Sequence, residues 1–308
     1  MSSLIEQAAE RLEQLRRAGV AIPEMAAVAA LSSPPIQPAA GLAATVVDAP
    51  AIIPAKPALS SRQVDLNLEA IAAAGIVTPN AARSHTADQY RVIKRPLISN
   101  AMGKGASKLS HGNLIMVTSA LVGEGKTYTS INLAMSIAAE LDNSVMLVDA
   151  DVARPSVLRV LGLPSSPGLL DLLEGKADMA GVLMRTNIDK LTILPSGTPH
   201  PRATELLASD AMRALLDDMA KRYPDRIIIF DSPPLLLTTE ARVLASQMGQ
   251  VVMVVHADKT LRRDVQRALS TIENCPVRLM LLNNARTDSA SGYGYGYGYG
   301  YGREKSAA

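Results

Sequence analysis

The sequence predicts an α/β fold with a doubly wound, mostly parallel sheet, and three observations lead to this prediction. Short apolar and β-branched segments alternate with helical stretches from about residue 114 onward, as expected for strands buried on both faces of a parallel sheet. A glycine-rich segment stands between the first of these strands and the helix that follows it. The 48% hydrophobic content is mainly aliphatic, with no Trp and a single Phe, which is typical of α/β layers.

Six segments are expected to be the strands of this sheet: 114–118, 144–148, 191–194, 226–230, 250–255 and 278–282. Helical patterns lie between several of them, at residues 129–141, 202–223 and 261–274. Because parallel strands joined by helices point the same way, their carboxyl ends meet at one edge of the sheet. Ligands of open α/β sheets bind at that edge, so residues directly after the strands are candidates for a functional site.

The region before the sheet is expected to consist of helices and a linker. Apolar residues recur at three- and four-residue spacing over 3–18, which predicts an amphipathic helix, whereas residues 22–60 are rich in Ala and Pro and suit a semi-extended linker. Shorter helices are expected at 65–74, and at 87–94 before Pro96 stops the helix. The predicted organisation is an amphipathic helix at 1–20, a Pro/Ala-rich linker at 21–62, a helical lead-in and oligomerisation segment at 63–98, a ligand-binding domain at 99–286 and a disordered Gly/Tyr-rich tail at 287–308.

Charge, cysteine content and hydropathy argue against several functional classes. The formal net charge of +2 gives no global reason to expect a nucleic-acid partner. Cys275 is the single cysteine, so neither an internal disulfide nor a cysteine cluster for zinc or iron–sulfur can form, and we expect a cytoplasmic protein. No run approaches the roughly 18 apolar residues of a membrane-spanning helix, so peripheral association with the inner membrane is expected to come through a partner.

The glycine-rich segment is Ala120-Leu-Val-Gly-Glu-Gly-Lys-Thr127, which fits the spacing of a Walker A phosphate loop except that Ala120 occupies the first glycine position. Gly123 and Gly125 would let successive backbone N–H groups converge on phosphate oxygens, and the following helix would add the positive end of its dipole. Lys126 is expected at the β- and γ-phosphates, and the hydroxyl of Thr127 at Mg²⁺. This predicts a P-loop NTPase fold of the deviant-Walker ATPase type that binds ATP and Mg²⁺.

Two later strands end in acidic residues. Asp149 and Asp151 follow the strand at 144–148, and Asp231 follows the strand at 226–230. On most surfaces such carboxylates would only be solvated strand ends, but here they share the predicted edge with a phosphate loop. Their proximity to that loop favours a Mg²⁺–ATP site.

Taken jointly, these segments resemble the bacterial tyrosine autokinases (BY-kinases), in which a Walker A loop, an Asp-x-Asp motif and a Walker B segment occur in this order. The C-terminal tail fits the same resemblance, because it contains tyrosines that alternate with glycine: Tyr293, Tyr295, Tyr297, Tyr299 and Tyr301. The resemblance covers roughly residues 85–302. Pro195-Ser-Gly197 and Glu205-Leu-Leu207 also look like family segments, and the N-terminal helix, the linker and Asp151-Val-Ala-Arg-Pro155 resemble the branch encoded with exosortase-type exopolysaccharide loci.

The resemblance implies an ATP-dependent protein-tyrosine kinase that phosphorylates its own tail in trans and regulates exopolysaccharide polymerisation or export. It implies that Asp149 helps to activate the attacking tyrosine hydroxyl, that Asp151 supports the metal and phosphate site, and that Asp231 holds Mg²⁺ through water. The catalytic set is then Lys126, Asp149, Asp151 and Asp231; the metal set is Thr127, Asp149 and Asp231; and the cofactor-binding set is Gly123, Glu124, Gly125, Lys126, Thr127, Tyr128 and Asn283, with Asn283 near the adenine. The resemblance implies three kinds of partner: further copies of the chain in a homo-oligomer such as a ring, a separate membrane-embedded polysaccharide chain-length regulator, and a cognate tyrosine phosphatase.

The sequence departs from the family pattern at two places. Relatives often have Arg two residues after the second Asp, where this chain has Ala153 followed by Arg154. Relatives also carry Glu-x-x-Arg-x-x-Arg on the helix before the core, which they use for ring assembly, whereas Asp88, Arg91 and Lys94 occupy that spacing here. Because Lys cannot make the bidentate contacts of Arg, we expect assembly to be weaker or differently organised.

Two other functions fit parts of the pattern. A partitioning-type ATPase switch of the deviant Walker class would have the same fold without kinase activity, but its additional loop lysine would fall at Leu121. In a non-enzymatic alternative, the core is a nucleotide-gated switch and the Gly/Tyr tail is an adhesive low-complexity segment. ATP hydrolysis without phosphotyrosine would favour either alternative over the kinase.

Overall fold

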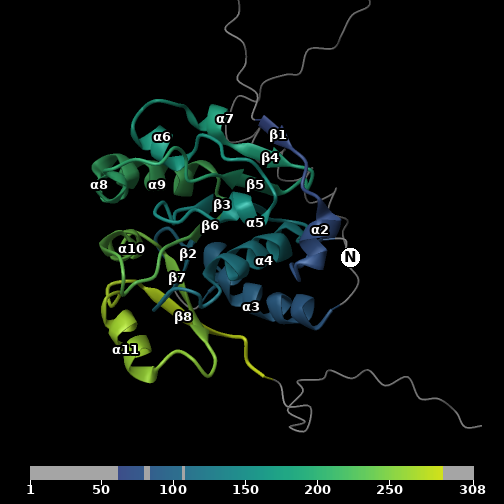
Figure 1. Ribbon diagram of the computed structural model, residues 1–308, viewed down its shortest axis with the longest axis vertical. Coiled ribbons are helices and arrows are strands. Elements are labelled where there is room, and N and C mark those ends of the chain that lie inside the picture. Colours follow the sequence, from purple (N-terminus) through teal and green to yellow (C-terminus); the bar gives the residue numbers. More distant parts are fainter. Residues whose placement is uncertain (1–61, 80–83, 106–107, 287–308) are drawn as a thin grey trace, which may run out of the picture. The chain divides into compact units, whose positions relative to one another are not determined.

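The computed structural model describes residues 62–79, 84–105 and 108–286 (Figure 1). The chain divides into two units, Met1–Ala55 and Lys56–Ala308, and the described residues all belong to the second. The expected helix at 3–18, the linker and the Gly/Tyr tail lie outside the described residues.

The described part of the chain folds around an eight-stranded sheet with the order β1-β4-β5-β3-β6-β2-β7-β8 (Figure 1). The strands are β1 (Arg62–Val64), β2 (Leu114–Ser119), β3 (Ser144–Asp149), β4 (Met184–Thr186), β5 (Leu191–Leu194), β6 (Arg226–Asp231), β7 (Gln250–His256) and β8 (Val277–Asn283). All neighbouring pairs are parallel except β4 with β5. All six expected strands are therefore confirmed, as is the mostly parallel α/β fold. The short strands β1 and β4 were not expected.

Helices cover both faces of the sheet (Figure 1). They are α2 (Leu68–Ala73), α3 (His85–Ala101), α4 (Lys126–Ala138), α5 (Val157–Val160), α6 (Leu169–Leu173), α7 (Met179–Val182), α8 (Ala203–Leu207), α9 (Asp210–Arg222), α10 (Thr239–Ala245) and α11 (Arg262–Ser270). Buried residues of α2 to α5 pack on one face of the sheet, and those of α6 to α11 pack on the other. This is the doubly wound arrangement, and it buries the central strands on both sides.

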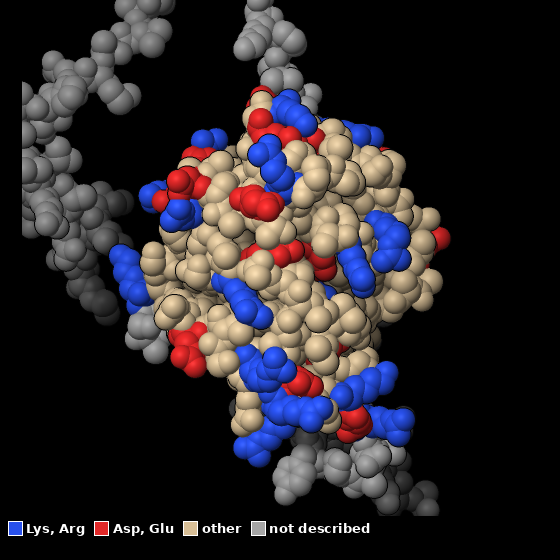
Figure 2. Space-filling view, turned by 60° about the vertical axis from the view of Figure 1, so that its left-hand side comes forward, with Lys and Arg blue, Asp and Glu red and all other residues tan. Residues whose placement is uncertain are grey.

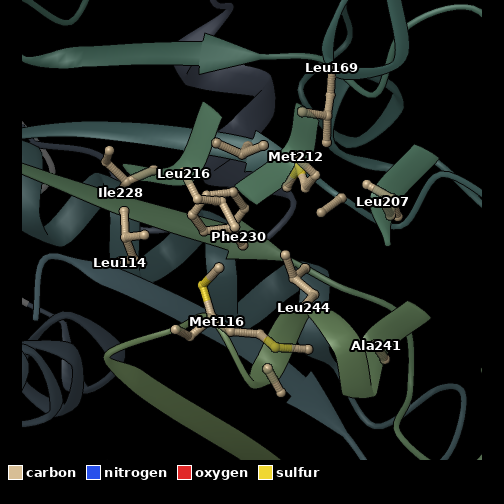
Figure 3. Packing of buried hydrophobic residues seen from close by; sticks show 14 of the residues in the cluster. Leu114, Met116, Leu169, Leu207, Met212, Leu216, Ile228, Phe230, Ala241 and Leu244 are labelled. Carbon is tan, nitrogen blue, oxygen red and sulfur yellow. The ribbon is translucent and has the colours of Figure 1, made fainter. Parts of the chain in front are cut away.

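Strand residues alternate between the two faces and so divide the core into two layers. Along β2, Leu114 and Met116 join the layer under α9 to α11, whereas Ile115 and Val117 join the layer under α3 and α4. Figure 3 shows the first layer, in which Phe230 of β6 lies among Met116, side chains of α9 and Leu244 of α10. This packing fixes β2 and β6 side by side, which sets the positions of the residues at their carboxyl ends.

Two helix predictions were wrong in detail. The helix expected to stop before Pro96 continues as α3 to Ala101. A proline leaves the carbonyl four residues earlier without a helical donor, and that residue, Val92, is 74% exposed, so water can bind the free carbonyl. Burial of Leu97, which is 1% exposed, then stabilises the continued helix.

The helix expected over 202–223 is divided into α8 and α9. Ser209 separates them, because its hydroxyl accepts a hydrogen bond from the amide of Met212 at 3.2 Å and so begins a new helix.

Candidate nucleotide and metal site

The phosphate loop connects β2 to α4 at the carboxyl edge of the sheet. Gly123 and Gly125 have φ angles of 79° and 95°, which lie in the left-handed region that favours glycine. Gly125 begins α4 without a side-chain cap, so the first amides of the helix are free to bind phosphate oxygens. The backbone of the loop therefore has the features that the sequence predicts for a phosphate site.

Thr127 links the phosphate loop to the end of β6. Its hydroxyl donates a hydrogen bond of 2.6 Å to Oδ2 of Asp231, and Ser130 donates to Oδ1 of the same carboxylate at 3.0 Å. Asp231 is fully buried, and burial raises its pKa to about 6, against the opposing effects of the Thr127 hydroxyl and the Lys126 ammonium. The structure thus brings together Lys126, Thr127 and Asp231.

Asp149 lies at the end of β3, opposite Asp231 in the ladder between β3 and β6. Its Oδ2 accepts hydrogen bonds of 3.0 Å from the amides of Ser156 and Val157, whereas its buried Oδ1 has no hydrogen-bond partner. Burial, with the neighbouring charge of Asp231, raises the pKa of Asp149 to about 7. One oxygen of this carboxyl group is therefore held in place while the other is free to take a proton or a ligand.

Asp151 is the third carboxylate of the site. It is 8% exposed, and its Oδ1 accepts a hydrogen bond of 3.2 Å from the amide of Arg154. Burial raises its pKa, and the positive charge of Lys126 opposes that shift. The side chains of Ala153 and Arg154 are both exposed.

The donors at this edge suit Mg²⁺. Among the described residues there is no group of three or more His, Cys, Asp or Glu side chains that could hold a metal ion on its own. Mg²⁺ bound with nucleotide needs fewer protein ligands, because phosphate oxygens and water complete its coordination. Thr127, Asp149 and Asp231 would hold the ion, and its charge would stabilise the ionised forms of two carboxyl groups whose pKa values burial has raised.

The other expected cofactor-binding residues have different surroundings. Asn283 lies at the loop, where its Nδ2 donates to the carbonyl of Glu124 at 3.0 Å. The carboxylate of Glu124 is buried and accepts hydrogen bonds from the amide of Leu121 and the hydroxyl of Thr260. The hydroxyl of Tyr128 donates to the carbonyl of Gly75 at 2.6 Å, so this side chain joins α4 to the segment after α2.

The three residues expected to mediate oligomerisation separate into two groups. Asp88 and Arg91 are exposed on α3 and form an ion pair of 2.6 Å with each other. Lys94 is 3% exposed and pairs at 2.6 Å with Glu140, just after α4. Within the described part of the chain, Asp88 and Arg91 are thus accessible at the surface, whereas Lys94 joins two helices of the same subunit.

The hydroxyls of Tyr90 and Tyr128 are poorly placed as phosphate acceptors. Tyr90 is 5% exposed, and burial raises its pKa to about 12. The Tyr128 hydroxyl donates a hydrogen bond to the carbonyl of Gly75. The guanidinium carbon of Arg226 lies 4.3 Å from the centroid of the Tyr223 ring, in a cation–π contact. The remaining tyrosines, at 293, 295, 297, 299 and 301, all belong to the tail, which lies outside the described residues.

The last strand of the described chain ends close to the phosphate loop. Strand β8 is parallel to β7, and Asn283, its last residue, contacts the loop through Glu124. Strand β8 therefore ends at the same edge of the sheet as the phosphate loop. Figure 2 shows basic side chains gathered at the end of the molecule where α11 lies, and three exposed cations of that helix are Arg262, Arg263 and Arg267.

Sequence reasoning missed three polar residues of the site. Ser130 follows Thr127 by three residues, so helical spacing alone would have placed both hydroxyls on the same face of α4. Ser156, whose hydroxyl lies 3.0 Å from that of Thr127, and Thr260 come from loops after β3 and β7. No local pattern identifies these two, because only the order of strands in the sheet brings their loops to the site.

Comparison with known proteins identifies several relatives of this chain. A protein-family model described as an AAA domain matches residues 112–282. The tyrosine-protein kinase YwqD of Bacillus subtilis (strain 168) is 30% identical over 71% of this chain and 89% of its own length. The tyrosine-protein kinase ptk of Acinetobacter johnsonii is 32% identical over 60% of this chain, but the match spans only 25% of that longer protein. Among solved structures, the kinase domain of the Escherichia coli tyrosine kinase ETK is 28% identical, with a TM-score of 0.54, over 61% of this chain and 73% of that one.

Proposed function

Because the chain belongs to the bacterial tyrosine-protein kinase family (the BY-kinases), we propose that it transfers the γ-phosphoryl group of Mg²⁺–ATP to tyrosines of its own tail. One observation carries this proposal: the tail follows β8 directly, and Asn283 at the end of β8 hydrogen-bonds to the phosphate loop. The acceptors are Tyr293, Tyr295, Tyr297, Tyr299 and Tyr301. Alternating glycines keep these side chains from packing into a stable strand, so each hydroxyl can be presented to a site.

Each site residue has a part in the proposed transfer. The tyrosine oxygen forms a bond to the γ-phosphorus as the bond to the β,γ-bridging oxygen breaks, and the hydroxyl proton passes to Asp149. Oδ1 of Asp149 has no competing hydrogen bond, so it is available to accept this proton, and burial of the carboxyl group favours its protonated form. Lys126 and the loop amides offset the charge on the phosphates, and Mg²⁺, when bound, supplies further charge stabilisation. Asp151 supports this set through its proximity to Lys126.

Transfer in trans, to the tail of another copy, is the mode that we propose. From Ala285 an extended chain spans about 33 Å to Tyr295 and about 53 Å to Tyr301, which reaches the site of either the same subunit or a neighbour. Asp88 and Arg91, exposed on α3, are the proposed contacts of the assembly.

The proposed cellular role is regulation of exopolysaccharide polymerisation or export from the cytoplasmic side of the inner membrane. None of the described helices is long and apolar enough to cross a membrane. The proposed partners are a membrane-embedded chain-length regulator, which recruits the kinase, and a tyrosine phosphatase that reverses the modification.

The proposed function is tested by comparing the full chain with a variant that ends at residue 286. After incubation with Mg²⁺–ATP, the full chain should gain phosphotyrosine, and the shortened variant should gain none while it still binds nucleotide. Labelling of the shortened chain at Tyr90, Tyr128 or Tyr223 would refute the tail as substrate. ATP hydrolysis by the full chain without any phosphotyrosine would favour the switch ATPase instead.

A further inference from the structure

A carboxylate is buried at the centre of the phosphate loop. Glu124 is 3% exposed, although it stands between the two glycines whose backbones shape the loop. Its Oε2 accepts a hydrogen bond of 2.6 Å from the amide of Leu121, and its Oε1 accepts one from the hydroxyl of Thr260. The loop is therefore closed on itself by one oxygen and attached to another part of the molecule by the other.

Thr260 lies in the segment that joins β7 to α11, and its hydroxyl is held in one orientation. It accepts a hydrogen bond of 3.1 Å from the amide of His256, while the amide of Thr260 donates to the carbonyl of His256 at 3.1 Å. A threonine hydroxyl has a single hydrogen, and here that hydrogen points to Glu124. Thr260 is thus fixed to the end of β7, the strand beside β2, and donates to the loop that follows β2.

A negative charge inside a phosphate-binding loop has to be kept away from the phosphates. A buried carboxylate that loses one of its donors would compete for other donors, and the free amides of its own loop are donors of this kind. Those amides are the groups that a nucleotide needs. The hydrogen bond from Thr260 prevents this competition by occupying Oε1 of Glu124. Asn283 holds the backbone of Glu124, because its side chain donates to the Glu124 carbonyl.

We propose that Thr260 is a positioning residue for nucleotide binding: by holding Glu124, it keeps the phosphate loop in the shape that accepts the β- and γ-phosphates. Thr260 contacts neither a carboxylate of the metal set nor Lys126 by hydrogen bond, so it acts through the loop rather than on the reacting atoms. The proposal rests on the use of this loop for ATP, as proposed above.

The test compares Thr260→Val, which keeps the shape but removes the hydroxyl, with Thr260→Ser, which keeps the hydroxyl. Thr271→Val is the matched control, because the Thr271 hydroxyl makes a local bond of 2.6 Å to Ala268 at the far end of α11. The dissociation constant of a fluorescent ATP analogue is measured with each purified full-length chain, together with KM for ATP and kcat for tail phosphorylation. We expect Thr260→Val to weaken binding about tenfold and to raise KM with a much smaller change in kcat, as for the loss of a bond to a charged group. Thr260→Ser should bind within about twofold of the unsubstituted chain, as should Thr271→Val.

Equal binding by Thr260→Val and the unsubstituted chain would overturn the proposal, and so would failure of Thr260→Ser to restore binding. Glu124→Gln provides a second test if Thr260→Val folds poorly. Its side chain has one accepting oxygen in place of two, so it cannot accept hydrogen bonds from both Leu121 and Thr260. It should weaken binding to a similar extent, and adding Thr260→Val to it should cause little further loss. Fully additive losses would contradict a shared mechanism. A chain that binds nucleotide but forms no phosphotyrosine would refute the kinase proposal alone, since the binding comparison would still test Thr260.

Discussion

The hydroxyl of Thr127 lies 2.6 Å from Oδ2 of Asp231, so the first turn of α4 is joined to the end of β6. The first residue belongs to the phosphate loop and the second to the acidic strand end, and 104 positions separate them in sequence. Their contact fixes two expected Mg²⁺ ligands relative to each other before any nucleotide binds. Preorganisation of this kind lowers the cost of assembling a metal site during the reaction.

Substitution Gly125→Ala should weaken nucleotide binding strongly. The φ angle of 95° strains any side chain, and a methyl group would lie 2.1 Å from Nδ2 of Asn283, which would have to give up its bond to Glu124. We expect affinity for an ATP analogue to fall by about a hundredfold or more, since strain and the lost bond together amount to about 3 kcal/mol.

Gly162→Ala is the control for that substitution. Gly162 has a φ of 71°, and an added methyl group would have no neighbour within 4 Å. The control should lose about 1–2 kcal/mol of stability from strain alone and keep its nucleotide affinity. Equal affinities of the two variants would show that the shape of the loop at Gly125 is unimportant.

Ionisation of Asp149 should destabilise the ligand-free protein. The pKa is 3.8 for an ordinary Asp and about 7 in the fold, so the folded state binds the proton more tightly and stability falls as the pH rises from about 4 to 7. Asp149→Asn should therefore increase the free energy of unfolding at pH 8, by an amount on the order of a few kcal/mol, with little effect at about pH 4. Denaturant unfolding at both pH values measures this difference.

The same substitution should reduce tail phosphorylation by about 10²–10⁴-fold, because the proposed base is lost. A variant that is less stable than the unsubstituted chain at pH 8 would contradict the argument from burial. Burial also raises the pKa of Asp231, to about 6, so Asp231→Asn should shift stability in the same direction.

The fold could be predicted from sequence where a pattern is local. The six apolar strands were found because strands buried on both faces are short and uninterrupted in apolar character, as in 226–230. Strands β1 and β4 have three residues each, which is too short for any periodicity to show. Pro96 was read as a helix end because local preference favours it, but tertiary burial of Leu97 extends α3 past it.

The site could be predicted where motif and fold coincide. Asp149, Asp151 and Asp231 lie at the expected edge because they follow predicted strands within a few residues. Lys126 and Thr127 lie there because a short loop joins the strand before them to the helix that they begin. The roles of Glu124 and Tyr128 could not be foreseen, since their partners Thr260 and Gly75 are distant in sequence. The position of Lys94 could not be predicted either. Its spacing from Asp88 and Arg91 suggests a surface motif, whereas the fold buries it beside Glu140.

Removal of Glu140 should destabilise the protein more than removal of Lys94. The Lys94 ammonium is buried, donates to the carbonyl of Ser136 and pairs with Glu140, so Glu140→Gln would leave a buried charge with one partner fewer. We expect a loss of about 2–3 kcal/mol for Glu140→Gln and a smaller loss for Lys94→Met, measured by chemical denaturation.

The exposed pair of Arg222 and Asp218 supplies the matched control. These side chains lie 2.8 Å apart on α9 and are largely solvated, so Asp218→Asn should change stability by less than about 0.5 kcal/mol. The hydrogen bond from Lys94 lowers the pKa of Glu140, so the contribution of this buried pair is present above pH 4.5 and is lost as the pH falls. Equal losses for Glu140→Gln and Asp218→Asn would show that the pair does not hold α3 to α4.

Phosphorylation in trans should be visible in a mixture of two chains, neither of which can phosphorylate its own tail. Lys126→Ala removes the charge at the phosphates but keeps the tail, and a chain ending at residue 286 keeps the site but has no acceptor tyrosines. Mixed with Mg²⁺–ATP, the Lys126→Ala chain should become labelled, whereas neither chain should be labelled when incubated alone. Absence of label in the mixture, together with labelling of the intact chain at a rate independent of its concentration, would show transfer in cis.

The most direct measurement is the mapping of phosphotyrosine by mass spectrometry after the purified full-length chain is incubated with Mg²⁺–ATP. Phosphate should be found on tyrosines between 293 and 301, should be absent from Tyr90, Tyr128 and Tyr223, and should be absent from the Lys126→Ala chain. Hydrolysis of ATP with an unmodified tail, or phosphate on the tail of the Lys126→Ala chain alone, would contradict the account.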